Sequence, residues 1–325
     1  MRAVRVREHG GPSVLSVAEV PRPDPGRGEV RIDVERSGVN FADIEKRRGR
    51  YPDPPEPPYV PGIEVAGRID AVGAGVGRRP GERVAAIIDR GGYAEYATAP
   101  ADALIGVPAG VGLGAAAGVP VGCLTAHNAL FEWGGLEPGE RVLVHAAAGG
   151  VGTAAVQLAA DAGATVFGTA STAEKLSLAA DLGADHAIDY TATDVAARIA
   201  DITDGEGVDL VLDGVGGDAF YAGLDALADC GRIVAYGLAS GDVPTVATPR
   251  LLFGNRAVLG YHLGHAREHA PERVRAGLDR LTDRLAAGAV EVTVGAEYPL
   301  ADAAEAHRAV EARETRGKVL LSPDG

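Results

Sequence analysis

A run of small residues between two apolar stretches is the feature of this sequence that most directly suggests chemistry. Residues 142–146 are apolar, a glycine-rich turn follows, and a helical pattern runs on from the turn. The turn contains Ala147, Gly149, Gly150, Val151 and Gly152. Its pattern, Ala-x-Gly-x-x-Gly, is a variant of the fingerprint of dinucleotide-binding βαβ units, in which small residues let the backbone approach a pyrophosphate. Because the first N–H groups of the following helix would face the phosphates, we expect a dinucleotide to bind here.

The end of the next apolar stretch indicates which dinucleotide is bound. Sites for NAD usually carry Asp or Glu at this point, where the carboxylate accepts hydrogen bonds from ribose hydroxyls. Here residues 165–169 form the predicted strand, Ser171 follows it, and Lys175 comes four residues after Ser171. A hydroxyl and an ammonium group suit a 2′-phosphate, whereas a carboxylate would repel it, so we expect NADPH. This requires the side chain of Glu174 to point away; the alternative is that Lys175 is an ordinary solvated helix residue.

Alternating strand and helix patterns surround this motif and predict a doubly wound parallel sheet. Apolar, β-rich stretches recur after the motif, and helical patterns separate most of them. The later candidate strands are residues 186–190, 208–213, 232–236 and 257–261, and the candidate helices are residues 173–182, 194–203 and 217–229. Ligands of such sheets bind at the carboxyl ends of the strands, where the strand order reverses.

The first part of the chain has a different pattern. Residues 1–120 contain short β-rich stretches that Gly and Pro interrupt, which favours a partly open barrel over βαβ units. Residues 290–298 and 319–321 are strand-like again, so we expect the end of the chain to rejoin this first part. The predicted fold class is therefore α/β, with a partly open β-barrel and a doubly wound parallel sheet.

Composition and charge restrict the partners and the compartment. The chain has 325 residues, a formal net charge of −14 and only two cysteines, Cys123 and Cys230. An acidic balance disfavours nucleic acid or an anionic membrane as a partner. No apolar run reaches the length of a membrane span, and residues 1–6 read as an alternating strand rather than a signal peptide. Two cysteines so far apart in the sequence give no disulfide framework, which is typical of a reducing compartment such as the cytoplasm.

Several further motifs make the whole chain similar to one known family. These motifs are residues 37–43, 48–52, 61–67, 91–96, 124–126, 147–152, 183–186, 303–308 and 317–319. With them the sequence resembles the medium-chain dehydrogenase/reductases, specifically the zinc-independent quinone oxidoreductases related to zeta-crystallin. The resemblance implies a GroES-like catalytic domain over residues 1–120 and 264–325, and a Rossmann NADPH-binding domain over residues 121–263. It also implies NADPH-dependent hydride transfer to a quinone or an α,β-unsaturated carbonyl compound, and a homodimer.

The same resemblance bears on the use of zinc. Zinc-dependent relatives carry Cys at the position of Ser37 and His at the position of Ile63. An isoleucine side chain cannot bind a metal and serine is a poor zinc ligand, so we expect no zinc. Three histidines, His262, His265 and His269, lie close together in the sequence. We interpret them as polar surface or cleft lining rather than as a metal site.

The resemblance also assigns roles to individual residues. By their positions in the family, Asn40 and Tyr51 lie beside the nicotinamide and the substrate and are the candidate catalytic residues, and Asn40 also binds the cofactor. The resemblance also assigns Thr125 and Tyr190 to the cofactor, with Tyr190 in the pocket for the 2′-phosphate. Gly237 and Tyr261 end predicted strands at the ligand-binding face of the sheet, where their backbone could contact the nicotinamide amide. Lys318 could reach the cofactor or be an ordinary solvated lysine. Taken alone, Asn40 could equally be a turn residue with local backbone bonds, and Tyr51 could pack on the proline-rich loop that follows it.

Two other functions remain open from the sequence. An enoyl-thioester reductase shares this fold, and Arg47, Arg48 and Arg50 near Tyr51 would suit a CoA or carrier substrate. A non-catalytic NADPH-binding or structural protein is the alternative of a different class. In the main hypothesis, hydride passes from the nicotinamide to the acceptor, and donors aimed at the acceptor oxygen stabilise the negative charge that develops there. Tyr51 or solvent then supplies the proton.

Overall fold

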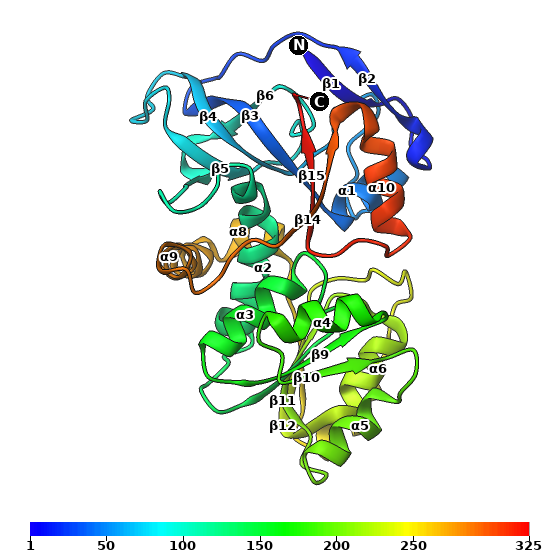
Figure 1. Ribbon diagram of the computed structural model, residues 1–325. Helices are drawn as coiled ribbons and strands as arrows, with labels where there is room; N and C mark the ends of the chain where they lie inside the picture. Colours follow the sequence, from blue (N-terminus) through cyan, green and yellow to red (C-terminus); the bar gives the residue numbers. More distant parts are fainter. Residues whose placement is uncertain (325) are drawn as a thin grey trace. The chain divides into compact units, whose positions relative to one another are not determined.

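The chain forms two compact units, as seen in a computed structural model that describes residues 1–324. The terminal unit comprises Met1–Gly122 with Val292–Gly325, and the inserted unit comprises Cys123–Glu291. Figure 1 shows that the blue and red ends of the chain both belong to the terminal unit, whereas the inserted unit runs from green through yellow to the orange of α8 and α9. No helix among the described residues has the length and apolar character needed to cross a membrane.

The terminal unit contains the predicted barrel. Its elements are β1 (Arg2–Val6), β2 (Leu15–Glu19), β3 (Glu29–Val39), α1 (Phe41–Arg48), β4 (Glu64–Val72), β5 (Arg83–Ile87), β6 (Tyr96–Pro100), β7 (Leu104–Gly106), β14 (Val294–Pro299), α10 (Ala303–Glu311) and β15 (Lys318–Ser322). The main sheet has seven strands in the order β14-β15-β3-β4-β5-β7, with β6 paired to β3, and β1 pairs with β2 separately. One apolar core lies among β3 to β7, and a second lies where α10 packs beside β1 and β15.

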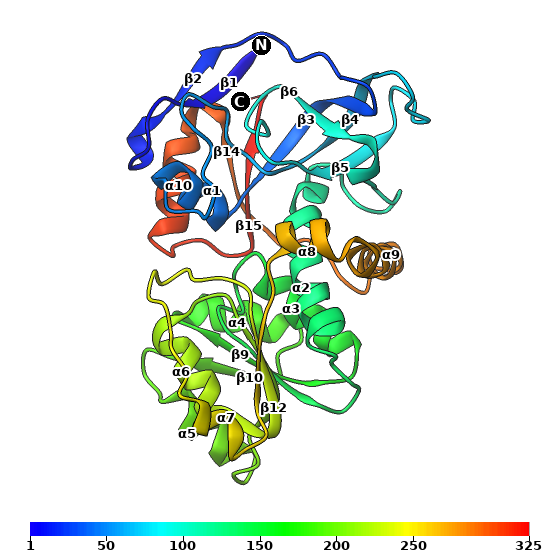
Figure 2. The same cartoon turned by 180° about the vertical axis from the view of Figure 1, so that it is seen from behind.

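The inserted unit contains the predicted doubly wound sheet. Its elements are α2 (Leu124–His127), β8 (Arg141–Val144), α3 (Gly152–Asp161), β9 (Thr165–Ala170), α4 (Ala173–Asp181), β10 (His186–Asp189), α5 (Val195–Ile202), β11 (Val208–Asp213), α6 (Gly217–Ala226), β12 (Leu227–Ala235), α7 (Thr248–Leu252), β13 (Ala257–Gly260), α8 (Leu263–His269) and α9 (Pro271–Ala287). The six parallel strands follow the order β10-β9-β8-β11-β12-β13, which is the 3-2-1-4-5-6 order of dinucleotide-binding folds. Figures 1 and 2 show α5 and α6 side by side in this unit. The strand order reverses between β8 and β11, where such folds bind their ligand.

The boundary after the inserted unit differs from the expected one at residue 263. Helices α8 and α9 remain in the inserted unit, and the chain enters the terminal unit only at Val292. The reason is packing, because α9 lies against α2 and the helical segment Asn128–Trp133. The approach is so close that a Cβ atom on Gly277 of α9 would lie 2.1 Å from Asn128 Oδ1.

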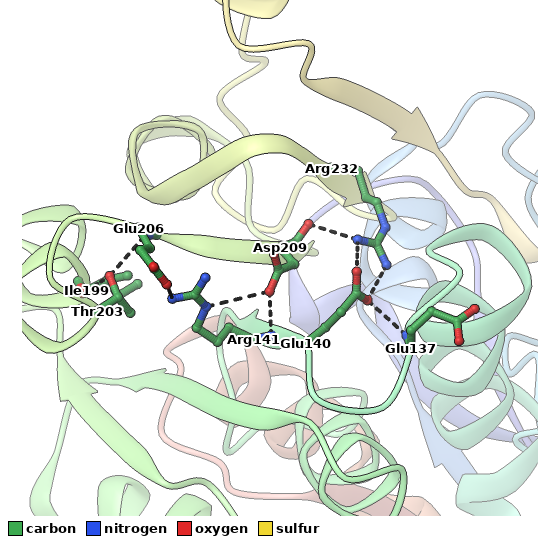
Figure 3. Close-up of polar contacts among 9 residues, drawn as sticks. Glu137, Glu140, Arg141, Ile199, Thr203, Glu206, Asp209 and Arg232 are labelled. Atoms are coloured by element: carbon green, nitrogen blue, oxygen red, sulfur yellow. Dashed lines mark hydrogen bonds and ion pairs between the residues drawn. The ribbon is translucent and has the colours of Figure 1, made fainter.

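A polar network joins three strands of the inserted sheet near their amino-terminal ends (Figure 3). Arg232 of β12 donates to both carboxylate oxygens of Glu140, at 2.8 and 2.7 Å, and to the carbonyl oxygen of Asp209 at 3.1 Å. Arg141, the first residue of β8, donates from its side chain to Glu206 at 2.7 Å. Its backbone N–H donates to the Asp209 carboxylate at 2.8 Å. These bonds tie β8, β11 and β12 together at the end of the sheet opposite to the ligand-binding end.

Candidate functional site

The turn between β8 and α3 depends on positions that carry no side chain. A Cβ atom on Gly152 would lie 2.2 Å from the carbonyl oxygen of Ala146, and one on Gly149 would lie 3.2 Å from the same oxygen. Ala146 adopts a φ of 51°, and its carbonyl oxygen accepts the Gly149 N–H at 2.8 Å. Helix α3 therefore starts directly against the turn, and two of its first N–H groups, those of Thr153 and Ala155, donate to carbonyl oxygens of the turn at 2.9 Å. The positive end of the helix dipole lies at this turn. This geometry fits an anion such as a pyrophosphate.

The alanine at the first glycine position of the fingerprint has a structural explanation. Ala147 is fully buried, and its N–H donates to the carbonyl oxygen of Thr169 in β9 at 3.0 Å. Gly168 lies opposite, where a Cβ atom would come within 2.9 Å of Ala147 Cβ. The methyl group of Ala147 thus fills the space that Gly168 leaves open.

The residues expected at the 2′-phosphate follow the carboxyl ends of two neighbouring strands, β9 and β10. Ala170 and Asp189 are partners in the sheet, and the Tyr190 N–H donates to the Ala170 carbonyl oxygen at 3.2 Å. Ser171 and Lys175 are half-buried, and Tyr190 is 44% exposed. The structure therefore places Ser171, Lys175 and Tyr190 at the same edge of the sheet.

Two acidic residues lie near these three, and a carboxylate that faced the 2′-phosphate would repel it. Glu174 is exposed at the start of α4. Asp189, which the sequence analysis did not consider, accepts the Thr191 N–H at 2.8 Å and the Thr191 hydroxyl at 2.6 Å, and these hydrogen bonds lower the pKa of its carboxyl. Its Oδ1 atom is thus engaged in its own turn, while β9 itself ends at Ala170 without an acid.

The other residues of the inserted unit that are expected at the cofactor differ in burial and in their contacts. Thr125 is buried in α2. A Cβ atom on Gly237, after β12, would lie 2.8 Å from the carbonyl oxygen of Gly214, so the segments after β11 and β12 approach closely there. Tyr261, after β13, is buried, and its hydroxyl accepts the Asn128 side-chain N–H at 3.1 Å. The Tyr261 side chain therefore belongs to the packing of the unit, and a contact between its backbone and the nicotinamide stays a prediction.

In the terminal unit, Asn40 is held by three groups. Its backbone N–H, at the start of α1, donates to Asp43 Oδ2 at 3.0 Å. Its side-chain Nδ2 donates to Glu64 Oε1 at 3.0 Å, and its Oδ1 accepts from Lys318 Nζ at 2.8 Å. Lys318 also forms an ion pair with the same oxygen of Glu64. The structure thus brings two of the expected residues, Asn40 and Lys318, together around a carboxylate that the sequence analysis missed.

Glu64 is the centre of this cluster and is completely buried, while Lys318 is 3% exposed. The second oxygen of Glu64, Oε2, accepts the N–H of Val121 at 2.8 Å. A buried carboxylate needs such partners because removing an unpaired charge from water is costly. The available signal was a single acid inside an apolar strand pattern, residues 63–66.

A second buried chain of polar groups leads from Arg47 to Asp43. Arg47 Nη1 donates to His307 Nδ1 at 3.1 Å, so the proton of a neutral His307 must be on Nε2. Burial, together with the nearby Arg47 charge, lowers the pKa of His307 to about 3 and keeps the ring neutral. His307 Nε2 lies 3.1 Å from the Tyr93 hydroxyl, which donates to Asp43 Oδ2 at 3.3 Å. Each donor in this chain therefore points toward Asp43.

Tyr51 follows α1 after Gly49, which ends the helix with a φ of 72°. The tyrosine is half-buried, and Lys46 Nζ lies 5.3 Å from the centre of its ring. Burial and the Asp43 charge raise the pKa of the Tyr51 hydroxyl, so this group stays protonated and can donate. Asn40 and Tyr51 thus flank the two ends of α1.

The three arginines near Tyr51 do not form an open basic patch. Arg47 is completely buried and forms an ion pair with Glu311. Arg48 pairs with Glu45 at 2.8 Å and with Glu311 at 3.1 Å. Arg50 is exposed. Two of the three cations that would suit a CoA or carrier phosphate are therefore neutralised within the terminal unit.

The positions that hold zinc in zinc-dependent relatives are used differently here. The Ser37 hydroxyl donates to the carbonyl oxygen of Gly92, and Ile63 offers only apolar atoms. Across residues 1–324, no group of three or more His, Cys, Asp or Glu side chains is arranged to hold a metal ion. His262 Nδ1 instead accepts the N–H of His265 at the start of α8, at 3.0 Å.

Known proteins are similar in sequence to both units. The chain matches the family model of the alcohol dehydrogenase GroES-like domain over residues 26–109 and that of zinc-binding dehydrogenases over residues 150–283. A quinone oxidoreductase of Pseudomonas aeruginosa is 36% identical, over 99% of this chain and 99% of that protein. A 2-haloacrylate reductase of a Burkholderia species is 37% identical, over 99% of this chain and 98% of that protein.

Solved structures share the fold. A mycobacterial protein in complex with NADPH has a TM-score of 0.93 at 41% identity, covering 99% of this chain and 100% of that chain. A quinone oxidoreductase of Escherichia coli, also in complex with NADPH, has a TM-score of 0.91 at 34% identity, covering 99% of this chain and 100% of that chain. The protein therefore belongs to the zinc-independent quinone oxidoreductases of the medium-chain dehydrogenase/reductase superfamily.

Proposed function

We propose that the protein is an NADPH-dependent reductase that transfers hydride to a quinone or to the activated double bond of an α,β-unsaturated carbonyl compound. The observation that carries this proposal is the turn between β8 and α3, where a Cβ atom on Gly152 would lie 2.2 Å from the Ala146 carbonyl oxygen, so that the start of α3 packs directly against the end of β8, as in dinucleotide-binding folds. The turn occurs in a chain similar over nearly its whole length to proteins solved with NADPH. Bound NADPH would supply the hydride, and the protein would bind and orient it.

In this proposal the inserted unit binds the cofactor. Backbone N–H groups of the turn after β8 bind the pyrophosphate, and Ser171, Lys175 and Tyr190 bind the 2′-phosphate, with Lys175 supplying the positive charge. The nicotinamide end is assigned to residues near the strand-order reversal and to Thr125. The complete set in this unit is Thr125, Ala147, Gly149, Gly150, Val151, Gly152, Ser171, Lys175, Tyr190, Gly237 and Tyr261.

The terminal unit acts on the acceptor. Hydride arrival leaves negative charge on the acceptor oxygen, and donors aimed at that oxygen lower the barrier. Asn40 Nδ2 and the Tyr51 hydroxyl are such donors. Because its pKa is raised, the Tyr51 hydroxyl is protonated and can donate a hydrogen bond or a proton. Because Ser37 and Ile63 offer no metal ligand set, we propose that this chemistry proceeds without zinc.

We rank small quinones and enones above enoyl thioesters as acceptors. A CoA or carrier thioester brings phosphates that need exposed cations, whereas Arg47 and Arg48 are paired with carboxylates. The Burkholderia relative is named for the reduction of 2-haloacrylate, which is a small unsaturated acceptor.

An acceptor screen tests the proposal. NADPH oxidation would be followed at equal acceptor concentrations with 1,4-benzoquinone, 9,10-phenanthrenequinone, 2-chloroacrylate and crotonyl-CoA, with and without a zinc chelator. We expect turnover with a quinone or the small acrylate that the chelator does not change. A clear preference for crotonyl-CoA would favour the enoyl-thioester reductase. NADPH binding without turnover of any acceptor would favour the non-catalytic protein.

We further propose that the protein is a homodimer of the cytoplasm. Strand β13 is the outermost strand of the inserted sheet, so one edge of its backbone has no neighbouring strand in the sheet. Shortly before it, Leu252 and Phe253 are 69% and 84% exposed. A second copy related by a twofold axis would cover both features. The two distant cysteines, Cys123 and Cys230, fit a reducing compartment.

A further inference from the structure

The side-chain amide of Asn40 is bonded at both ends to one buried ion pair. Its Oδ1 accepts from Lys318 Nζ at 2.8 Å, and its Nδ2 donates to Glu64 Oε1 at 3.0 Å. Glu64 and Lys318 are in turn bonded to each other. The three side chains therefore form a closed triangle inside the terminal unit.

The sheet itself explains how these residues meet. Asn40 comes directly after β3, and the two strands that flank β3 at this end are β15 and β4. Lys318 is the first residue of β15 and Glu64 is the first residue of β4. A donor and an acceptor are thus supplied from the two neighbouring strands of the same sheet.

Two glycines leave space for the ion pair. A Cβ atom on Gly38 would lie 2.1 Å from Glu64 Oε1, and one on Gly118 would lie 2.9 Å from Lys318 Cγ. Neither glycine has a positive φ, so the backbone conformation does not require glycine at these positions. The space is occupied by the side chains of the pair.

We propose that Glu64 and Lys318 are positioning residues that allow only one orientation of the Asn40 amide. A half-turn of an asparagine amide exchanges its donor and its acceptor. Lys318 can only donate and an ionised Glu64 can only accept, so the reversed orientation would place donor against donor and acceptor against acceptor. Neutral partners such as Gln or Ser would tolerate both orientations.

The fixed orientation leaves one hydrogen of Asn40 for a ligand. The first Nδ2 hydrogen is bonded to Glu64, whereas the second has only a long contact of 3.5 Å to the Gly38 carbonyl oxygen. This second hydrogen is the one that would donate to the acceptor oxygen. The inference therefore rests on the proposed function, in which Asn40 acts on the acceptor.

Side-chain amide NMR tests the orientation without reference to turnover. The chain contains only three asparagines, Asn40, Asn128 and Asn255, and one glutamine, Gln157. The spectrum of the 15N-labelled protein therefore holds four side-chain amides, and Asn40→Ala identifies the Asn40 pair. We expect solvent exchange of the Asn40 amide to be at least about tenfold slower than that of the exposed Asn255.

Glu64→Gln should release the orientation, because the new amide can donate as well as accept. The introduced glutamine adds one amide pair of its own, and beyond that pair we expect the Asn40 signals to double or to move toward those of Asn255. Glu297→Gln, which alters a partly exposed ion pair with Arg36 in the same unit, is the control and should leave the Asn40 signals unchanged. Glu64→Gln could fail to fold because Lys318 loses its charged partner. In that case the double variant Glu64→Gln/Lys318→Met, which removes both charges, takes the place of the single variant in the test.

Kinetics then separate a positioning role from a purely structural one. We expect Glu64→Gln to lower kcat/KM by about 10- to 100-fold, and to lower it no further when Asn40 is already Ala. Effects that multiply in the double variant, or Asn40 signals that Glu64→Gln does not change, would overturn the inference. Wild-type kcat/KM in Asn40→Ala would instead refute the proposed role of Asn40 itself, and the inference would fall with it.

Discussion

Lys175 is the residue that separates the two nicotinamide cofactors most directly. In the proposed pocket its ammonium group pairs with a phosphate that only NADPH carries, and a hydrogen bond between charged groups is worth about 2 kcal/mol. Lys175→Ala should therefore weaken NADPH binding by about 30-fold and leave NADH binding nearly unchanged, as measured by fluorescence titration. Arg198→Ala, on the exposed face of α5, is the control. Equal losses for both cofactors would remove the phosphate assignment.

The Tyr51 hydroxyl is the proposed hydrogen-bond or proton donor to the acceptor. Because burial raises the pKa of its hydroxyl, the group is protonated at neutral pH and can supply a hydrogen bond or a proton. Tyr51→Phe should lower kcat by about 100-fold with little change in KM, since the contact strengthens as charge develops on the acceptor. Unchanged kcat would leave the tyrosine as a packing residue and solvent as the proton source.

Residues at the ends of strands were predictable from the sequence because the fingerprint fixes their places. Ser171, Lys175 and Tyr190 follow β9 and β10 for this reason. Glu64 was not predictable in the same way, since its partner Lys318 is 254 positions away and the pairing depends on how β15 and β4 flank β3. A lone acid in an apolar run indicates that a partner exists but does not identify it.

The chain of polar groups from Arg47 to Asp43 links α1, α10 and the loop that contains Tyr93. His307 has a folded pKa of about 3, below the ordinary 6.5, so the unfolded chain takes up its proton first and stability is lost as pH falls through this range. Asp43 acts in the opposite direction. Its folded pKa is about 6, above the ordinary 3.8, so the stability it contributes in acid is lost as pH rises between these values.

Asp43→Asn should therefore steepen the loss of stability in acid. The substitution removes the group that opposes His307, and the change should be confined to roughly pH 4 to 6. Urea unfolding midpoints at several pH values would measure it, and His307→Gln should give the opposite change in slope. A slope in Asp43→Asn that is unchanged or shallower than in the wild type would contradict the assignment.

The network at the amino-terminal edge of the inserted sheet gives a prediction about stability alone. Arg232 bonds Glu140 through two parallel N–H groups and also donates to Asp209, a geometry that lysine cannot reproduce. Arg232→Lys should lower the free energy of unfolding by about 2 kcal/mol in urea titrations. Arg250→Lys, in a more exposed pair with Asp225, should cost less than about 0.5 kcal/mol. Cofactor affinity should not change in either variant, because the network lies at the opposite end of the strands.

Element type was predictable where hydrophobic periodicity is strong, as in the parallel strands, and less so where Gly and Pro are frequent. Residues 113–135 have a helical pattern, but the chain there passes through a short 3-10 helix at Ala115–Gly118, π-helical turns and the single α-helical turn α2. The extent of the inserted unit was also not predictable. An amphipathic pattern shows that α9 buries one face but not which unit covers that face.

At the scale of the whole molecule, the proposed dimer depends on the inserted unit. Leu252 and Phe253 are 69% and 84% exposed shortly before the edge strand β13, and adjacent exposed apolar side chains of this size are typical of an interaction surface. Phe253→Asp should shift the protein from dimer to monomer in light scattering coupled to size exclusion. Val17→Asp, at an exposed apolar position of β2, should leave the mass unchanged. A wild-type protein that is already monomeric would refute the dimer.

The pairing of Ala147 with Gly168 has a consequence for how such chains are recognised. A single methyl group, that of Ala147, occupies the space between the turn and β9, and a Cβ atom on Gly168 would lie only 2.9 Å from it, so the two positions share one volume. A sequence pattern that requires glycine at the first position of the fingerprint would miss chains that have alanine there and glycine at the facing position of the next strand. The two positions are therefore best read together, as a pair with room for one methyl group.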